Sequence, residues 1–220
     1  MAVRTFDVEK AINERGAMKR ILIATSNPGK MRDFAGAAAA HGIKIVGIPN
    51  FSSFPSAAED GTTFEENARK KAEHYSHLAP GEMVVADDSG LEVDALNGAP
   101  GVHSARYANL GAATEGNSND AANNARLLRD LADLSDVHRS GRFVCVLAVG
   151  RDGKTLAAFR GEAEGRILHA PRGTNGFGYD PLFYFSELGK AFGELGAVEK
   201  DTVSHRGAAL RKFLEWCERL

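Results

Sequence analysis

The sequence has few of the features that mark specialised classes of protein. Of its 220 residues only two are cysteine, one is tryptophan and seven are proline, and the formal net charge is −2. A chain with so small a net charge has no broad positive field with which to collect nucleic acid or an acidic membrane surface. Any anion that it binds must therefore be held by a few local groups.

The two cysteines exclude a disulfide framework. Cys145 lies in an apolar run and Cys217 in a predicted helix, so both are predicted to be core thiols rather than a disulfide or a metal site. The sequence also lacks a secretory segment and any apolar run near the roughly 20 residues that a membrane span needs. Together these absences predict a protein of the reducing cytoplasm that has no membrane partner.

The centre of the chain holds an apolar run that ends in two acids. Met83–Ala86 is followed by Asp87 and Asp88, and then by Ser89 and Gly90. This pattern is typical of a buried strand that delivers acidic side chains to a site at its C-terminal tip. Adjacent carboxylates stay ionised together most easily when a cation lies between or beside them. For an isolated Asp-Asp pair an exposed turn is the simpler interpretation, so the rest of the chain has to decide.

A polar segment follows the first predicted strand, Arg20–Ala24, and precedes a helix predicted over Met31–His41. Its residues are Thr25, Ser26, Asn27, Pro28, Gly29 and Lys30. A lysine and free backbone N–H groups at a helix N-terminus favour phosphate, because the N–H groups and the helix dipole both attract an anion. The segment lacks the first glycine and the final Ser/Thr of a Walker loop. An ordinary capped loop fits the motif equally well.

The next predicted helix, Thr63–His77, carries Asn67 and Lys71 on one face, one turn apart. Lys71 is either a phosphate contact or, as is usual for lysine, a solvated surface residue. Glu59 lies just before this helix and is either a surface acid or a metal ligand.

The C-terminal third adds a glycine-rich segment, residues 171–180, which ends in Phe177, Gly178, Tyr179 and Asp180. A helix is predicted over Ser204–Leu220, with His205 and Arg206 in its first turn. The N-terminal end of a helix disfavours positive charge, so this pair indicates a bound anion or an acceptor rather than helix stability.

The remaining pattern is that of an α/β protein. Strands are predicted over Ile43–Ile48, Leu91–Leu96, Arg142–Val149, Lys154–Arg160, Glu162–Leu168 and Pro181–Phe185, and a helix over Asp120–Leu134. We interpret Gly161 as the joint between two antiparallel strands and Asn97-Gly98 as a hairpin turn.

The polar groups together describe a magnesium-dependent nucleoside triphosphate site. A polyphosphate needs cationic and N–H donors, Mg²⁺ needs carboxylates, and a base needs an aromatic face with fixed donors or acceptors at its edge. No residue has the pattern of a covalent nucleophile, since Cys145 lies in a predicted core strand and no serine lies in an elbow motif. Water is therefore the expected nucleophile, with a carboxylate as its base.

Five sequence blocks make this interpretation more specific. They are ATSNPGK (24–30), EDGTTFEENARKKA (59–72), ADDSGLEVDALNGAPGVHSARYA (86–108), GTNGFGYDPLF (173–183) and SHRGAAL (204–210). In this order they resemble the inosine triphosphate pyrophosphatase-like family, the non-canonical purine NTP pyrophosphatases that include the dITP/XTP pyrophosphatases. The resemblance spans nearly all of residues 21–220.

The resemblance implies an elongated, two-lobed α/β fold with a mixed central β-sheet, flanking helices and a cleft between the lobes. It implies one such domain over residues 20–220, after an N-terminal extension over 1–19, and usually a homodimer. The implied activity is hydrolysis of ITP, dITP and XTP to the monophosphate and pyrophosphate, with Mg²⁺ as cofactor.

The resemblance also implies residue roles. Thr25 to Lys30 and Lys71 would hold the phosphates, and Ser89 would touch the substrate. Glu59 and Asp88 would ligate Mg²⁺; Asp88 would also accept the proton of the attacking water, and Asp87 would support it or bind metal. The base pocket would consist of Phe177, Gly178, Tyr179, Asp180, Lys200, His205 and Arg206.

Two other functions remain open at this point. One is a pyrophosphatase for modified pyrimidine nucleotides, which would need a smaller base pocket. The other is a nucleotide-binding or sensing module without activity, although sensing alone does not need the water-activating acid.

Overall fold

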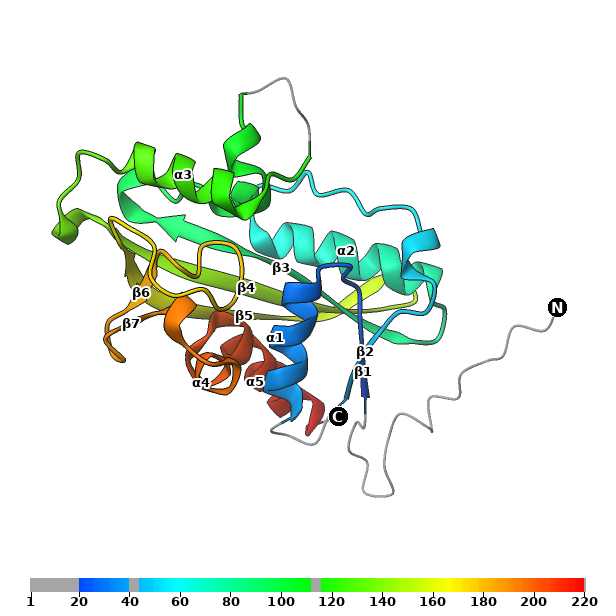
Figure 1. Cartoon of the computed structure of the whole chain (residues 1–220). Helices are drawn as coiled ribbons and strands as arrows, with labels where there is room; N and C mark the ends of the chain where they lie inside the picture. Colours follow the sequence, from blue (N-terminus) through cyan, green and yellow to red (C-terminus); the bar gives the residue numbers. More distant parts are fainter. Residues whose placement is uncertain (1–19, 40–43, 112–115, 220) are drawn as a thin grey trace.

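The computed structural model describes residues 20–39, 44–111 and 116–219 (Figure 1). The N-terminal extension predicted over residues 1–19 lies outside these residues, as does the predicted end of the first helix at His41. Among the helices that the structure describes, none combines the length and the apolar character of a membrane span.

The described strands form one mixed sheet in the order β2-β1-β3-β4-β5-β6-β7. β1 pairs in parallel with β2 and β3, and every pair from β3 to β7 is antiparallel. The strands are β1 (Arg20–Ile23), β2 (Lys44–Gly47), β3 (Met83–Val93), β4 (Ser140–Arg151), β5 (Lys154–Ile167), β6 (Phe183–Phe185) and β7 (Lys190–Ala191). The prediction of an α/β fold with a mixed sheet is confirmed.

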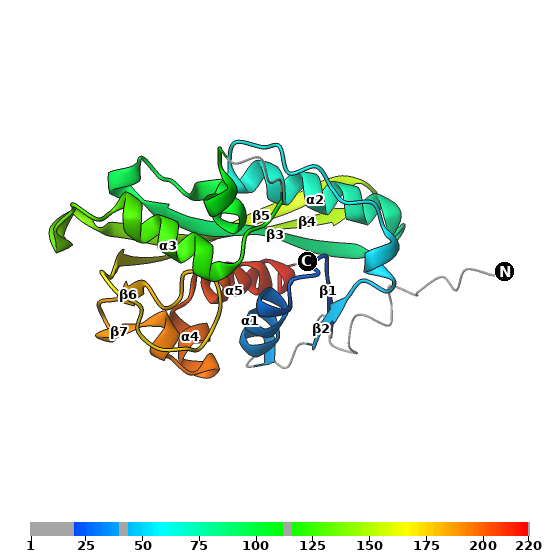
Figure 2. The same ribbon diagram turned by 45° about the horizontal axis from the view of Figure 1, so that its top comes forward.

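Helices cover both faces of this sheet (Figures 1 and 2). The α-helices are α1 (Pro28–Ala39), α2 (Phe64–Leu78), α3 (Asp120–Asp130), α4 (Ala197–Val203) and α5 (His205–Cys217). The 3-10 segments are η2 (Phe51–Ser53), η3 (Asp94–Leu96), η4 (Gly101–Asn109), η5 (Asp136–His138) and η6 (Phe192–Glu194). α2 packs on β3, β4 and β5, and α5 packs on β4 and β5 from the other side.

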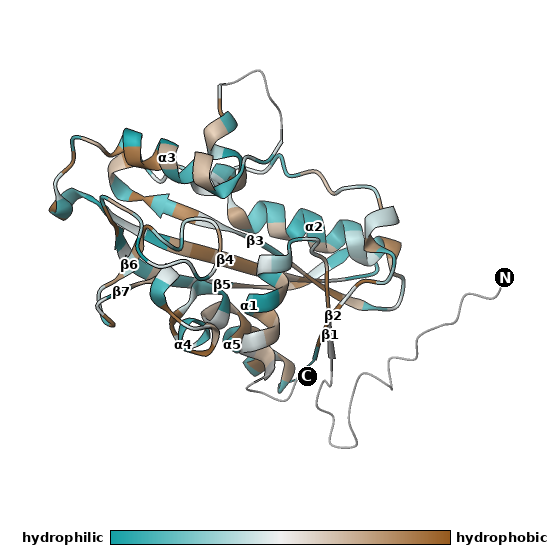
Figure 3. Ribbon diagram, in the orientation of Figure 1, coloured by the Kyte–Doolittle hydropathy of each residue, from teal (hydrophilic) through white to brown (hydrophobic). Residues whose placement is uncertain are grey.

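The core is divided accordingly. One apolar cluster fills the space under α1 and α5, a second lies under α2, and a third joins η4, α3 and the far ends of β3 to β5. Figure 3 shows the result as a largely apolar β4 beneath a polar outer side of α2. Cys145 is fully buried in the first of these clusters, and neither cysteine is bonded, as predicted.

The prediction that the apolar strand ends at Asp87 and Asp88 is wrong. β3 continues through both acids to Val93, and β4 pairs with it along its whole length, from Met83↔Arg151 to Val93↔Gly141. The strand continues because buried apolar residues, Leu91 and Val93, follow the acids and because β4 supplies a partner of full length. The acids therefore lie in the middle of a central strand.

Gly161 does not separate two strands, which corrects a second prediction. β5 is one continuous strand, and a Cβ at Gly161 would collide with the backbone oxygen of His205. Glycine is needed there because the start of α5 rests directly on the strand. In place of the predicted hairpin, the 3-10 segment η3 follows β3. Asn97 and Gly98, which come after η3, both have positive φ, and one bridge joins Glu92 to Pro100. β7 and α4 were not predicted.

Two further glycines bring α1, α4 and α5 together around Asp201. A Cβ at Gly36 would collide with the Asp201 carboxylate, and a Cβ at Gly207 would collide with the Asp201 carbonyl oxygen. Burial raises the pKa of Asp201 from its ordinary 3.8 to about 6, the nearby Asp33 carboxylate adds to the rise, and Lys200 opposes it.

We expect Asp201→Asn to stabilise the protein at pH 7.5 but not at pH 4. The folded state binds a proton at Asp201 more readily than the unfolded state, so the ionised carboxylate costs stability above pH 6 and nothing below its unfolded pKa. The gain at pH 7.5 should be about 1 kcal/mol once solvent screening of this partly exposed group is allowed for. Urea unfolding at both pH values measures it; an equal difference at both would contradict the assignment.

Candidate active site

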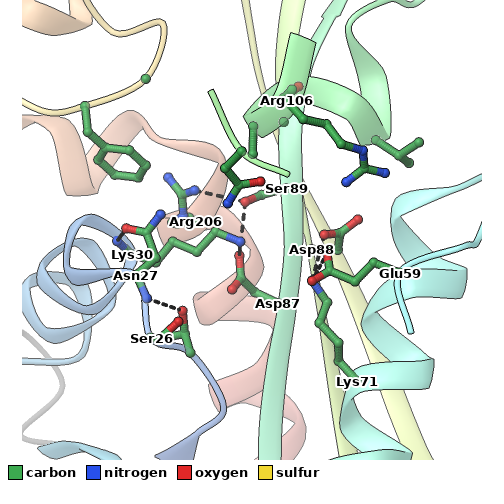
Figure 4. Close-up of a pocket in the computed structure, with 18 of the residues that line it drawn as sticks. Ser26, Asn27, Lys30, Glu59, Lys71, Asp87, Asp88, Ser89, Arg106 and Arg206 are labelled. Carbon is green, nitrogen blue, oxygen red and sulfur yellow. Dashed lines mark hydrogen bonds and ion pairs between the residues drawn. The ribbon is translucent and has the colours of Figure 1, made fainter. Parts of the chain in front are cut away.

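A cavity of about 520 Å³ opens where β1 ends and β3 continues (Figure 4). The last backbone hydrogen bond between the β1 segment and β3 is donated by the Ala24 N–H to the Val85 oxygen, at 2.8 Å. Beyond it the chain turns away into α1, and the next four lining residues of β3 form one wall of the cavity: Asp87, Asp88, Ser89 and Gly90. The cavity thus follows from two neighbouring strands of unequal length.

Asp87 and Asp88 point to opposite faces of the sheet, as Figure 4 shows on either side of β3. This separation follows from the alternation of side chains along a strand. Each acid has its own lysine: Lys30 of α1 lies 2.9 Å from Asp87, and Lys71 of α2 lies 2.8 Å from Asp88. Each carboxylate therefore has a cation beside it, and no single cation lies between the two in the described structure.

The Asp88 side is a small network that is buried except for Glu59. The Lys71 Nζ contacts Asp88 Oδ1 at 2.8 Å and Glu59 Oε2 at 3.2 Å, and the Asn67 amide donates to Asp88 Oδ2 at 3.2 Å. Lys71 is buried, so it is not the solvated surface lysine of the simpler interpretation. Burial alone would lower its pKa, but the carboxylates of Asp88, Asp87 and Glu59 outweigh burial and raise it.

The environments of the two acids push their pKa values apart. Burial raises the pKa of Asp88 more than the positive charges of Lys71 and Lys30 lower it. Burial acts in the same direction on Asp87, but Lys30, Arg206 and Lys71 together outweigh it and lower the pKa of that carboxyl. A pair of carboxyl groups tuned in opposite directions is the pattern that separates a proton acceptor from a permanently charged neighbour.

The carboxylates suit a divalent ion that the substrate completes. Among the residues that the structure describes, no group of three or more His, Cys, Asp or Glu side chains could hold a metal alone. Glu59 and Asp88, however, both contact the Lys71 ammonium, so two carboxylates face one cation position. Mg²⁺ is commonly held by one or two carboxylates, waters and substrate phosphates. Asp87 is instead engaged by Lys30 and by the Ser89 hydroxyl, which donates to it at 3.0 Å.

The segment Thr25–Lys30 differs in one respect from the predicted anion loop. α1 begins at Pro28, and the Asn27 side chain accepts hydrogen bonds from the N–H groups of Gly29 at 2.8 Å and Lys30 at 3.2 Å. Two of the helix N–H groups are therefore already bound. Thr25, Ser26, Asn27 and Lys30 line the cavity, whereas Pro28 and Gly29 do not.

Phe177 joins this segment to the other end of the cavity. A Cβ at Gly29 would lie 2.5 Å from the Phe177 ring, so glycine lets the ring rest on the start of α1. The ring centroid lies 5.0 Å from the Arg206 guanidinium and 5.3 Å from the Lys200 Nζ. Gly178, Tyr179, Asp180, His205 and Arg206 line the cavity with Phe177. Lys200 is absent from the lining and reaches the site through Asp180, 2.7 Å away.

The two residues that open α5 differ in charge. Burial and the neighbouring Arg206 lower the pKa of His205 well below its usual value, so His205 is neutral, and the expectation of two cations is wrong for it. Arg206 has the acceptors that its position demands: Asp33 Oδ2 at 3.0 Å and Ser89 Oγ at 2.9 Å. In the described part of the chain, His205 Nδ1 and Arg206 Nε are buried without any hydrogen-bond partner.

Sequence reasoning placed Asn67 beside Lys71 without a role, and it missed Asp33 and Arg106 among other residues of this region. Asn67 contacts Asp88, Asp33 contacts both Lys200 and Arg206, and Arg106 lines the cavity from η4 (Figure 4). Asp33 shares a face of α1 with Lys30, but its partners Lys200 and Arg206 are 167 and 173 residues away in the sequence, so no local pattern indicates the contact. Arg106 lies in the block 86–108 that carries the resemblance, but no role was predicted for it, and η4 brings it to the cavity from a 3-10 segment interrupted at this residue.

Known proteins resemble this chain over most of its length. The model of the Ham1 family matches residues 21–216. A dITP/XTP pyrophosphatase of Acidobacterium capsulatum is 49% identical over 196 residues, which are 88% of this chain and 96% of the relative. One of Geobacillus kaustophilus is 47% identical over 203 residues, 92% of this chain and 96% of the relative. The solved structure of a HAM1 protein from Coxiella burnetii covers 92% of this chain and 100% of its own, at 39% identity and a TM-score of 0.77.

Proposed function

The chain belongs to the Ham1 family, and on this basis we propose that it hydrolyses the non-canonical purine nucleotides ITP, dITP and XTP to the monophosphate and pyrophosphate. The observation that carries the proposal is one cavity with two chemically different ends. One end holds lysines and carboxylates, and the other holds Phe177 with buried polar groups of α5. The first suits a triphosphate and the second suits a base.

The proposed reaction is attack of water on the α-phosphorus. Asp88 accepts a proton from the water, a new oxygen–phosphorus bond forms, and the bond between the α-phosphorus and the bridging oxygen of the pyrophosphate breaks. The raised pKa of Asp88 suits a proton acceptor, and its hydrogen bond from Asn67 fixes the carboxylate orientation. Lys30 and Lys71 supply positive charge at either side of the phosphates.

Glu59 and Asp88 are the residues that would hold Mg²⁺, and we propose Mg²⁺ as the divalent ion because it favours carboxylates together with phosphate oxygens and waters. When bound, it would neutralise charge on the leaving pyrophosphate. Asp87 remains a predicted possible ligand; its ion pair with Lys30 favours a role in positioning that lysine.

The base end favours a 6-oxo purine. Hypoxanthine and xanthine carry an acceptor oxygen where adenine carries an amino donor, and Arg206 and Lys200 are donors. Arg206 lines this end of the cavity, and its guanidinium donors suit a 6-oxo group and not a 6-amino group. A buried donor that faces a donor can cost on the order of 10⁴ in discrimination.

The direct test is pyrophosphate release from a panel of ITP, dITP, XTP, ATP, GTP and UTP, with Mg²⁺ and with excess chelator. We expect kcat/KM for ITP and XTP to exceed those for ATP and UTP by at least about 10²-fold, and the activity to vanish with chelator. Equal turnover of ATP or UTP would refute the substrate class, and activity on modified pyrimidine nucleotides alone would favour that alternative.

For the mechanism, we expect Asp88→Asn to lower kcat by at least about 10²-fold while ITP still binds, because the variant loses a proton acceptor and a proposed metal ligand. Asp87→Asn is the matched comparison, since it removes the adjacent carboxylate on the opposite face and should chiefly raise KM through the loss of Lys30 positioning. Circular dichroism checks the fold of both. Near-wild-type turnover in Asp88→Asn would refute its role.

Arg106 is a further proposed phosphate contact. Of the lining residues with a permanent positive charge, Lys30, Lys71 and Arg206 pair with carboxylates, whereas Arg106 has no such partner in the described residues. A cation without a carboxylate partner can meet a phosphate without first giving up an ion pair. We therefore expect Arg106→Ala to raise KM for ITP about tenfold. Arg129→Ala, an exposed arginine of α3, is the control, and an unchanged KM in Arg106→Ala would exclude the contact.

The cytoplasmic location, the homodimer, the absence of nucleic-acid partners and the single domain over residues 20–220 stay predictions. Size-exclusion chromatography with light scattering would test the dimer directly.

A further inference from the structure

Asp33 links the two ends of the cavity. It lies on α1 three residues after Lys30, and its side chain is 14% exposed. Its Oδ2 atom accepts from the Arg206 Nη1 at 3.0 Å and from the Lys200 Nζ at 3.4 Å. A single carboxylate on the helix of the phosphate segment therefore contacts both cations of the proposed base pocket.

The two cations depend on Asp33 to different degrees. Lys200 has a closer partner in Asp180, at 2.7 Å. Arg206 forms its one carboxylate pair in the described structure with Asp33. Loss of the Asp33 charge would therefore leave Lys200 paired and Arg206 without a counter-ion at a position where Arg206 is only 5% exposed. The guanidinium is the group that Asp33 controls.

A chain of polar contacts connects Arg206 to Lys30. Its second terminal nitrogen, Nη2, donates to Ser89 Oγ at 2.9 Å, Ser89 donates to Asp87 at 3.0 Å, and Asp87 pairs with Lys30 at 2.9 Å. Since Lys30 and Asp33 both belong to α1, the path begins and ends on the same helix. The planar guanidinium is held at both terminal nitrogens, which fixes its orientation.

We infer that Asp33 is a specificity-determining positioning residue: it fixes the orientation of the Arg206 guanidinium at the base end of the cavity, so that this donor group meets the 6-oxo group of the base. This inference rests on the proposed function and goes beyond it, because it assigns base selection to a residue of the phosphate-binding helix. The Phe177 ring, 5.0 Å from the guanidinium, covers the same group and limits its other orientations.

The experiment compares kcat/KM for ITP and ATP in Asp33→Asn, Asp33→Glu and wild type. We expect Asp33→Asn to lower the ITP-to-ATP ratio at least about tenfold, because the neutral amide no longer fixes the guanidinium, and Asp33→Glu to restore most of the ratio, because it keeps the charge. A purely structural role would lower both rates together and leave the ratio unchanged. Asp33→Ser serves as a second neutral variant should Asp33→Asn fold poorly.

Two controls make the test specific. Asp201→Asn removes a neighbouring carboxylate that makes no hydrogen bond to Lys200 or Arg206 in the described structure, and it should leave the ratio unchanged. Inhibition by inorganic pyrophosphate, which lacks a base, should also be unchanged in Asp33→Asn. In Arg206→Ala the ratio should fall, and the added Asp33→Asn should lower it no further, since Asp33 acts through Arg206.

The outcomes separate the inference from the function on which it rests. Wild type without a preference for ITP over ATP would overturn both. Wild type with that preference, together with an unchanged ratio in the neutral Asp33 variants, would overturn the inference alone. Independent effects of Asp33→Asn and Arg206→Ala on the ratio would also overturn it.

Discussion

The alternation of side chains along β3 is the constraint on which the site depends. It sends Asp87 to the face that α1 and α5 cover and Asp88 to the face that α2 covers, so that each acid meets a lysine from a different helix. The register is fixed by β4, which pairs with every residue of β3. A slip of one residue would exchange the faces and bring each acid to the other's surroundings. The environment of each acid therefore depends on the pairing register of β3 with β4.

The cavity contains many charges but little uncompensated charge. Asp87 is paired with Lys30, and Asp88 and Glu59 share Lys71. Lys200 is paired with Asp180 and Asp33, and Asp33 is also paired with Arg206. Buried ions need such partners, because desolvation of an unpaired ion costs several kcal/mol. The ion pairs stabilise the site in the absence of substrate. A bound triphosphate or divalent ion must therefore replace some of these ion pairs with its own contacts.

The sequence could predict what depends on neighbouring residues. The loop and helix start at Thr25–Lys30, the α2 helix from Thr63 and the α5 helix from Ser204 were all visible as local patterns. Whether β3 ended or continued at its acids depended on β4, some 50 residues later, and the role of Gly161 depended on the approach of α5. Asp33 and Arg106 escaped for the same reason, since their importance arises only from contacts between distant segments.

The continuity of β3 also divides the site by mobility. Backbone amides of a central strand that is paired along its length exchange their hydrogens with solvent only through the largest openings of the protein, whereas helix ends and glycine-rich segments open locally and often. Asp88 thus lies on backbone that β4 pairs along its whole length, whereas the residues around Asn27 and Phe177 lie in segments that open more readily. Substrate binding would accordingly order the two ends of the cavity around a carboxylate that is already fixed. The loss of conformational entropy on binding would then fall on the groups that hold the nucleotide and not on the group proposed to react with water.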